Sequence, residues 1–373
     1  MISPTIQSVQ TARVRLSADA QLTVRGARGL HAESDFLLVR VLAATPHGRV
    51  GEGFGEVSAT PVWSGEDGAS AEHFVQTVLA PLLVGAPLVP VAALEQAMDA
   101  VLAGNVFTKA GVATALWDCW ARVLDVPLAV ALGGLLRTEV PIKMSISGDG
   151  SELARSFAAV RARGVGGYKV KVGLDPVADL ERVRAARELA GANALLGVDA
   201  NGGWSRSDAA RIIAALREQE IAFVEQPCAP DDLSGLHAAR DHGVPIIADE
   251  SVFTTGDLVR LIRADAADLV SVYVGKAGGP GRAVEQGRVA SAFGLGCVVG
   301  SNGEFGIGAA AQLQVACALP GLSEAVPSDI IGALYYTEDI LATPLDSDGR
   351  RVRLGDGPGL GVRPREDIMA RFR

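Results

Sequence analysis

Between residues 140 and 330, short β-rich runs alternate with helical stretches at a nearly constant interval. The polar residues that close five successive runs, Lys169, Asp199, Glu225, Asp249 and Tyr273, are 30, 26, 24 and 24 positions apart. This interval fits one strand plus one helix, the repeating unit of a parallel sheet. Eight such units predict a closed (β/α)8 barrel. An open doubly wound sheet is the alternative, but no glycine-rich phosphate loop opens its first unit. The eight runs are Ile142–Ser147, Gly167–Val172, Ala194–Ala200, Ile221–Pro227, Val244–Glu250, Leu269–Val274, Gly296–Ser301 and a weaker one at Glu324–Ile330.

The residues before the barrel follow a different pattern. Phe36–Ala44 and Arg49–Val57 read as the two strands of a hairpin with a turn at Pro46–Gly48. Lys109–Leu124 has apolar residues at helical spacing and predicts a helix. Strands followed by helices, without the βα period, indicate an α+β unit.

The chain therefore divides into two predicted domains. Residues 1–125 form an α+β domain, and residues 126–332 form the barrel that carries the polar strand ends. The tail, residues 333–373, is rich in turns, and we expect it to pack back over the N-terminal domain and complete it.

Composition excludes several classes of protein. With 49% hydrophobic and 21% charged residues, this 373-residue chain can bury a large core and is not disordered. Its formal charge of −9 argues against nucleic acid as a partner, because that binding depends on neutralising phosphates. The N-terminus lacks the apolar core of a signal peptide, and the longest uncharged stretch, Thr77–Leu94, contains three prolines. Four widely spaced cysteines without a CxxC pair fit a reducing compartment. We expect a soluble cytoplasmic protein with no membrane partner.

Three carboxylates, Asp199, Glu225 and Asp249, end three consecutive predicted strands. Neighbouring parallel strands are about 4.8 Å apart, so we expect these side chains to converge on one point. A single acid at a strand end more often caps a helix or pairs with a lysine, but three in register favour a metal site. An all-oxygen set suits Mg²⁺ or Mn²⁺, and zinc is disfavoured because none of the five histidines lies at a strand end.

Lys169 and Lys171 lie on the second predicted strand, with only Val170 between them. Because side chains alternate along a strand, both point the same way, into the barrel. Two ammonium groups this close lower each other's pKa, which would let one of them act as a base. A metal ion beside a lysine base favours removal of the proton α to a carboxylate through an enediolate intermediate. Asn201 and Glu250 are candidates to orient the metal ligands by hydrogen bonds without contacting the metal ion.

At this point the sequence resembles a known family. The segments YKVKV, VDANGGW, VEQP and ADES, in this order, with KAGVATALWD before the barrel and GEFGIGAAA after its seventh run, are similar to the enolase superfamily, muconate-lactonizing subgroup. The resemblance implies an N-terminal capping domain over a modified (β/α)8 TIM barrel, one Mg²⁺ or Mn²⁺ per subunit and a homo-oligomer. It makes Asp199, Glu225 and Asp249 the metal ligands, Lys171 the acid/base residue and Lys169 its electrostatic partner.

One position departs from the family pattern. Members of this subgroup place a second acid/base lysine on the sixth strand, five residues before a Gly-Gly pair. Here the pair is Gly278-Gly279, and the residue five positions before it is Tyr273. Lys276 matches a different, commonly basic, loop position. A shift of three residues in this registration is the alternative. With an ordinary pKa of about 10, a tyrosine is a poor base at neutral pH, although it can donate a proton or a hydrogen bond.

The absence of a second base narrows the chemistry. Racemases and epimerases need a base on each face of the substrate, so single-base reactions are favoured. We predict a muconate cycloisomerase-like isomerase acting on a small carboxylate. The alternative is a syn-eliminating lyase, either o-succinylbenzoate synthase-like or a hydroxy-acid dehydratase. A racemase or epimerase and a non-catalytic binding protein rank lower.

Substrate contacts are expected from the capping domain and from the ends of two barrel strands. Arg28 and His31 could meet a second carboxylate, and Trp63 could cover an apolar portion of the substrate. Further candidates are Ser147 after the first run and Asn302 and Glu304 after the seventh.

Overall fold

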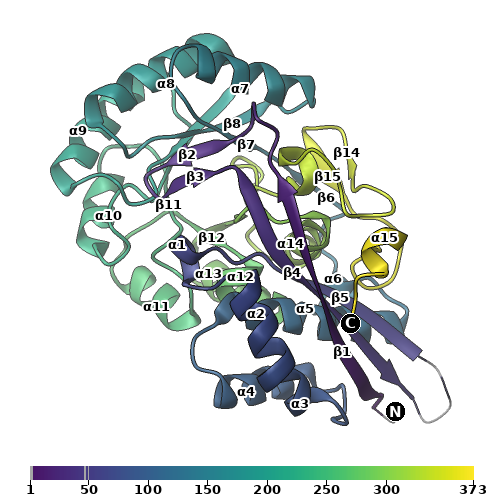
Figure 1. Ribbon diagram of the computed structural model, residues 1–373. Helices are drawn as coiled ribbons and strands as arrows, with labels where there is room; N and C mark the ends of the chain where they lie inside the picture. Colours follow the sequence, from purple (N-terminus) through teal and green to yellow (C-terminus); the bar gives the residue numbers. More distant parts are fainter. Residues whose placement is uncertain (1–2, 46–47, 49) are drawn as a thin grey trace.

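A computed structural model describes residues 3–45, 48 and 50–373. An N-terminal region of antiparallel strands and helices lies against a larger body of parallel strands ringed by helices (Figure 1). The predicted turn at Pro46–Gly48 includes two residues outside the described ones. Among the described residues, no helix is long and apolar enough to cross a membrane.

The N-terminal region is built on a three-stranded antiparallel sheet in the order β1-β4-β5. Helix α5 packs on β5, and it starts and ends close to the prediction. Gly53 and Gly55 make this packing possible, because a Cβ atom at either position would meet the backbone of α5. The strands are β1 (Thr5–Ser17), β2 (Val24–Gly26), β3 (Gly29–His31), β4 (Glu33–Ala44) and β5 (Val50–Val57). The helices are α1 (Pro61–Ser64), α2 (Gly68–Phe74), the π-helical turn η1 (Val75–Leu79), α3 (Ala80–Leu83), α4 (Val91–Val101), α5 (Val106–Leu124) and α6 (Leu128–Ala131).

Seven parallel strands form the body of the barrel, in the sequential order β7 to β13. Each strand contains buried residues throughout or nearly so, as expected for a parallel sheet covered by helices. The strands are β7 (Met144–Ile146), β8 (Gly167–Lys171), β9 (Leu195–Asp199), β10 (Val224–Glu225), β11 (Ile246–Ala248), β12 (Leu269–Val272) and β13 (Gly296–Val299). The helices are α7 (Ser151–Ala162), α8 (Pro176–Ala190), α9 (Arg206–Leu216) with η2 (Arg217–Gln219), α10 (Leu233–Arg240), α11 (Thr255–Arg263), α12 (Val274–Ala277), α13 (Pro280–Ala292) and α14 (Gly306–Ala318).

The eighth predicted strand, Glu324–Ile330, is not a regular strand. Pro327 lacks the N–H group that a ladder would require. The segment nevertheless lies between the first and last strands, because Ser328 donates to the carbonyl of Pro141 at 2.9 Å and Asp329 donates to the carbonyl of Val299 at 2.8 Å. It therefore fills the remaining gap between β13 and the residues that lead into β7.

The C-terminal tail contacts both regions. Arg373 and Thr11 exchange backbone hydrogen bonds of 3.1 and 3.2 Å, and β15 pairs with β6 at the start of the barrel. The division into domains at residues 125 and 332 stays a prediction. The tail elements are η3 (Gly332–Tyr335), β14 (Asp346–Ser347), β15 (Arg351–Arg353) and α15 (Glu366–Met369), and β6 spans Glu139–Pro141.

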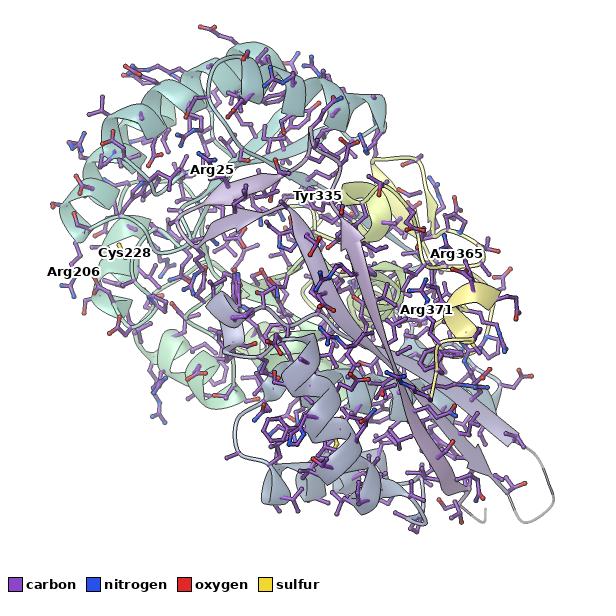
Figure 2. All side chains as sticks on the ribbon, in the orientation of Figure 1. Arg25, Arg206, Cys228, Tyr335, Arg365 and Arg371 are labelled. Atoms are coloured by element: carbon purple, nitrogen blue, oxygen red, sulfur yellow. The ribbon has the colours of Figure 1, made fainter. Side chains whose placement is uncertain are left out.

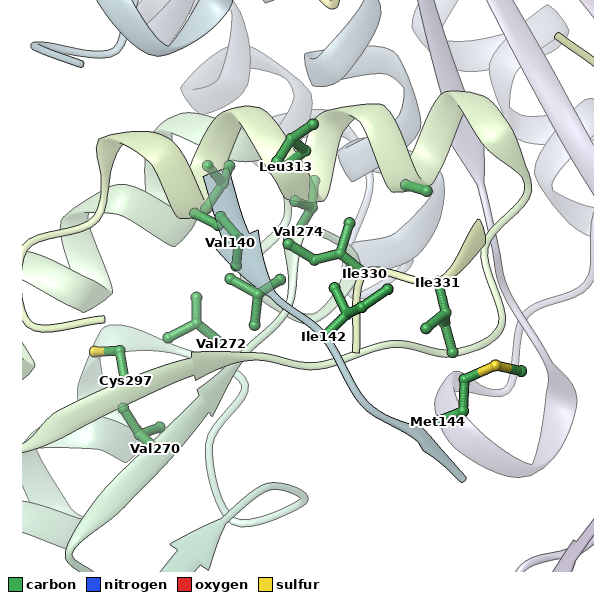
Figure 3. Close-up of a cluster of buried hydrophobic side chains, with 14 of the residues drawn as sticks. Val140, Ile142, Met144, Val270, Val272, Val274, Cys297, Leu313, Ile330 and Ile331 are labelled. Atoms are coloured by element: carbon green, nitrogen blue, oxygen red, sulfur yellow. The ribbon is translucent and has the colours of Figure 1, made fainter. Parts of the chain in front are cut away.

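A continuous apolar core holds the strands in register. In Figure 3, Val272 of β12, Cys297 of β13 and Leu313 of α14 belong to one buried cluster that also includes Ile142 and Ile330 from the two chain segments beside the barrel's gap. The eighth segment is thus anchored by apolar burial as well as by backbone hydrogen bonds. This packing fixes the positions of the strand ends.

Candidate active site

A cavity of about 300 Å³ opens at the carboxyl ends of the barrel strands. The barrel contributes the cavity floor, with Lys169, Lys171 and Asp329 among its lining residues. The hairpin β2–β3 and the short helix α1 form the roof; in Figure 1 the hairpin crosses in front of the barrel strands, and β2 contacts β8. A cavity in this position is where barrel enzymes hold their substrates.

Both lysines of β8 reach the cavity floor, as the strand alternation predicts. The Nζ atom of Lys171 lies 2.7 Å from Oδ2 of Asp199 and 3.0 Å from Oδ1 of Asn201. The Nζ atom of Lys169 lies 3.0 Å from Oε2 of Glu225, 3.1 Å from Oδ2 of Asp329 and 3.6 Å from Oδ2 of Asp199. Lys169 therefore sits among three carboxylates, whereas Lys171 has one.

The surroundings of Lys169 correct one expectation. Burial lowers the pKa of its ammonium group, but Asp329, Glu225 and Asp199 raise it, and the net pKa is well above the usual value. The predicted lowering of the pKa is therefore wrong for Lys169, because the nearby negative charges outweigh the effect of burial. Lys169 is a permanent cation at the cavity floor.

The three predicted metal-binding carboxylates are buried side by side. Asp199 pairs in register with Glu225 on the neighbouring strand, and Asp249 follows the end of β11. Their side chains are at most 1% exposed. Burial raises the pKa of Glu225 to about 7, and the charges of Asp199 and Asp249 contribute. For Asp199 burial also raises the pKa, but Lys171 and Lys169 bring it below the usual range.

The carboxylates do not converge on one point as the sequence predicts. Lys169 contacts Asp199 and Glu225, whereas Asp249 is held by Lys276 at 2.5 Å. Across the described residues, no three His, Cys, Asp or Glu side chains are arranged so that they could hold a metal ion. The donor chemistry nevertheless fits a hard cation, because Oε1 of Glu225 is buried beside two other acids and has no hydrogen-bond partner among the described residues. The metal site stays a prediction.

Tyr273 occupies the side of the cavity opposite Lys171. It follows β12, which is separated from β8 by three strands and thus lies across the barrel. The Tyr273 side chain lines the cavity, and its hydroxyl donates to Oδ2 of Asp249 at 3.1 Å. Burial raises the pKa of Tyr273 well above 10, and the charges of Asp249 and Glu225 add to this effect. Tyr273 is therefore a neutral hydrogen-bond donor.

Lys276 does not line this cavity. Its ammonium group is buried beneath Tyr273, 4.2 Å from the ring centroid, and donates to the backbone carbonyls of Asp249 at 2.7 Å and Ser271 at 3.0 Å. The structure thus directs Tyr273, and not Lys276, toward the space that a substrate would occupy.

Arg28 and Trp63, two roof residues predicted to contact the substrate, contact residues of the cavity floor in this structure. Nε of Arg28 donates to Oε1 of Glu250 at 3.1 Å, and the guanidinium lies 5.0 Å from the centroid of the Trp63 ring. Trp63 in turn stacks on Tyr273, with ring centroids 5.8 Å apart. Glu250 also accepts from the side-chain amide of Asn201 at 3.0 Å. Arg28 and Trp63 therefore connect the capping loops to the strand ends.

The remaining predicted contacts divide into two groups. His31 and Asn302 line the main cavity, and His31 contacts the Ser34 hydroxyl at 2.9 Å. Ser147 lines a smaller neighbouring cavity, and Glu304 is directed away from both. Ser147 accepts from the backbone of Arg25, and Glu304 binds side chains and backbone groups of its own loop and of α14. Both have local structural partners that replace the expected substrate contact.

Sequence reasoning missed Asp329 and Tyr335, which also line the cavity. Asp329 binds Lys169 and, at 2.9 Å, Lys143, and its Oδ1 is buried without a partner among the described residues. Asp329 lies near the end of the weak eighth run, just as Asp199, Glu225 and Asp249 close earlier runs. That shared position could have identified Asp329 as a site residue. Tyr335 binds the backbone of Ser145 and comes from the tail, which has no strand pattern.

A buried set of lysines and carboxylates at the strand ends of a capped barrel defines an enzyme-like cavity, and comparison with known proteins assigns the chain to a family. The mandelate racemase / muconate lactonizing enzyme N-terminal domain matches residues 11–133, and the enolase C-terminal domain-like family matches residues 152–368. The chain belongs to the mandelate racemase / muconate lactonizing enzyme family of the enolase superfamily. The predicted family and fold class are confirmed. Enzymes of this family generally use a divalent metal ion such as Mg²⁺.

The relatives include several activities. Muconate cycloisomerase 1 of Rhodococcus opacus is 32% identical over 89% of this chain and 90% of its own. The L-Ala-D/L-Glu epimerase of Bacillus subtilis is 33% identical over 83% of this chain and 85% of its own. The crystal structure of muconate lactonizing enzyme from Pseudomonas fluorescens complexed with muconolactone superimposes with a TM-score of 0.90 at 27% identity, covering both chains completely. Isomerases of different specificity thus share this fold and similar sequences.

Proposed function

We propose that this protein is a divalent-metal-dependent isomerase of the cycloisomerase type, which removes or delivers the proton α to the carboxylate of a small substrate with a single lysine. The observation that carries the proposal is the asymmetry of the cavity. Lys171 lines one side, next to a buried carboxylate, and a tyrosine faces it from the other side.

Asp199, Glu225 and Asp249 are the residues that would hold Mg²⁺ or Mn²⁺. Bound there, the cation would supply positive charge to a substrate carboxylate, whose negative charge increases when the α-proton leaves. The buried, unpartnered Oε1 of Glu225 supports this assignment. The number of acids in the network also supports it, because the neighbouring lysines neutralise only part of the negative charge.

Lys171 would move the proton. Its side chain is 14% exposed and reaches the cavity, whereas that of Lys169 is 5% exposed and bound to three acids. Lys169 would hold the substrate carboxylate by its permanent charge. Tyr273, whose hydroxyl donates to Asp249, would line the opposite face of the substrate, and it provides no second base. Proton transfer is therefore confined to one face of the substrate.

Asn201, Glu250 and Lys276 would position these groups without touching the substrate carbon. Asn201 links Lys171 to Glu250, with Oδ1 accepting from Lys171 and Nδ2 donating to Glu250. Lys276 fixes the backbone and side chain of Asp249. These contacts hold the acid/base lysine and one of the proposed metal ligands in place.

The direct test is exchange of the substrate α-proton with solvent. The purified protein would be incubated in D₂O with Mg²⁺ or Mn²⁺ and a panel of small carboxylates beginning with cis,cis-muconate, and followed by NMR, with Lys171→Ala as the blank. We expect deuterium incorporation or product formation that requires both the metal and Lys171. Exchange that persists in Lys171→Ala would contradict the assignment.

The products distinguish the related reactions. A lactone formed from muconate identifies a cycloisomerase. Loss of water from a β-hydroxy acid identifies the lyase on the same scaffold. Deuterium entering with inversion at the α-carbon would identify a racemase or epimerase and would contradict the single-base proposal.

A further inference from the structure

The charges around the cavity constrain the substrate beyond its reacting carboxylate. Three cationic side chains line the cavity, and each is already paired with a buried carboxylate: Lys169 with Glu225 and Asp329, Lys171 with Asp199, and Arg28 with Glu250. Only the lysines lie beside the proposed metal ligands, where a substrate carboxylate would bind. In the described part of the chain, the wall away from the lysines offers no unpaired cation.

Two other basic residues of the hairpin do not change this balance. His31 is bound to Ser34 and lies near Tyr336, and burial together with the charge of Lys171 lowers its pKa. Arg25 is exposed on β2 (Figure 2) and lines the smaller cavity, whereas its neighbours Val24 and Gly26 line the main one. The alternation of side chains along β2 therefore turns Arg25 away from the active cavity.

The rest of the cavity wall combines aliphatic, aromatic and polar side chains. Leu22, Val24, Leu30, Val62 and Ile331 provide aliphatic surface, and Trp63 adds an aromatic face. Glu33 also lines the cavity and would repel a second anion. A carboxylate placed against this wall would lose hydration without gaining a cation, which costs more than placing a neutral group there.

We propose that the substrate carries one carboxylate, bound at the lysine end of the cavity, and that the remainder is uncharged. This inference rests on the proposed function, which places the reacting carboxylate beside Lys171. Because muconate is a dicarboxylate, lactone formation from muconate in the exchange experiment would overturn this inference and leave the proposed function standing. The inference differs from the expectation that Arg28 and His31 meet a second carboxylate, and it takes their contacts with Glu250 and Ser34 as the reason.

Three unreactive six-carbon probes test the inference on the Mg²⁺-loaded protein: hexanoate, the monoamide of adipate, and adipate. Dissociation constants measured by calorimetry should be at least about tenfold lower for hexanoate and for the monoamide than for adipate, since an unpaired carboxylate loses at least 1.4 kcal/mol. Leu30 is 59% exposed at the cavity mouth, so it can be replaced without disturbing the core. Leu30→Arg should improve adipate binding by about tenfold relative to hexanoate, and Leu30→Gln, which adds polarity without charge, should not.

The outcomes separate the two proposals. Adipate binding as tightly as hexanoate, or more tightly, would overturn the single-carboxylate inference and leave the proposed function standing. An equal gain in Leu30→Gln and Leu30→Arg would show that polarity alone limits adipate binding, and would overturn the charge argument. Failure of all three probes to bind in the presence of Mg²⁺ would overturn the proposed function, and the inference with it.

Discussion

The floor and the roof of the cavity are built in different ways. On the floor, Lys169, Asp199, Glu225 and Asp249 come from adjacent strands or their ends and are at most 5% exposed; Lys169 binds Asp199 and Glu225, and Lys276 binds Asp249. On the roof, Leu30 and Val62 are 59% and 63% exposed and belong to a two-stranded hairpin and a four-residue helix. The floor is a dense network of charges, whereas the roof has few strong contacts.

This difference separates chemistry from selectivity. The strand register places the floor groups relative to one another, so their geometry depends on the barrel and tolerates little change. The roof touches the floor mainly through Arg28 and Trp63. Loops carried by a rigid scaffold can change sequence without disturbing the scaffold. Substitutions on the floor should therefore abolish the reaction, and substitutions on the roof should change which substrate is used.

The largest effect is expected at Lys171. Lys171→Ala should lower kcat by about 10³-fold, because it removes the only proposed acid/base group. Lys171→Arg keeps the positive charge but cannot release a proton near neutral pH, so it should be equally inactive. Steady-state kinetics measure both, and calorimetric titration with Mg²⁺ should show that metal binding survives. A Lys171→Arg variant with near-normal turnover would assign this residue an electrostatic role only.

The next effect is expected at Tyr273. Tyr273→Phe removes one hydrogen bond to Asp249 and should lower kcat by about tenfold or less. Tyr273→Lys would place a second base across from Lys171, and it should introduce deuterium at the opposite face of the substrate in D₂O. A loss in Tyr273→Phe as large as that in Lys171→Ala would instead identify Tyr273 as a required proton donor.

A smaller effect is expected on the roof, at Arg28. Arg28→Met breaks the contact with Glu250, and it should raise KM about fivefold or less while kcat changes little, because the Arg28 side chain is 29% exposed and the buried Glu250 keeps its hydrogen bond from Asn201. Arg25→Met is the matched control on the same hairpin, since Arg25 lines the other cavity. If both variants raise KM equally, the hairpin as a whole, and not the Arg28 contact, controls binding.

The smallest effect is expected where the N-terminal region contacts the barrel, and it is an effect on the stability of the fold. Glu56 of β5 accepts hydrogen bonds from Phe305 and Gly308 at the start of α14, next to the buried Glu304. Burial raises the pKa of Glu56 to about 8, from 4.5. The folded protein therefore holds this proton more tightly than the unfolded chain does. The stabilisation is complete below pH 4.5 and is lost as the pH rises toward 8.

Glu56→Gln should flatten this part of the stability curve. The melting temperature of the wild-type protein, followed by circular dichroism, should include a decline of a few degrees between pH 5 and 8 that Glu56→Gln lacks. Glu72→Gln, on the surface helix α2, should keep the wild-type slope. A slope unchanged in Glu56→Gln would show that Glu56 is ionised throughout this range.

The sequence by itself determined most of the barrel. The βα period located the seven regular strands, and the helix at Lys109–Leu124 was predicted nearly to its ends. These features were readable because hydrophobic periodicity is a local property of the chain. The eighth segment was harder to predict because its place depends on hydrogen bonds to Pro141 and Val299, far away in the sequence.

The sequence also identified the side chains at the floor of the cavity, since strand ends and the alternation of Lys169 and Lys171 follow from local pattern. Only the tertiary structure decided how these groups are paired. Arg28 and Glu250 are 222 positions apart, and Trp63 meets Tyr273 across two regions. A charged side chain in a loop reads the same in sequence whether it is free or bound. Its partner is fixed by packing between distant segments, and that packing pairs Arg28 of the roof with the buried Glu250.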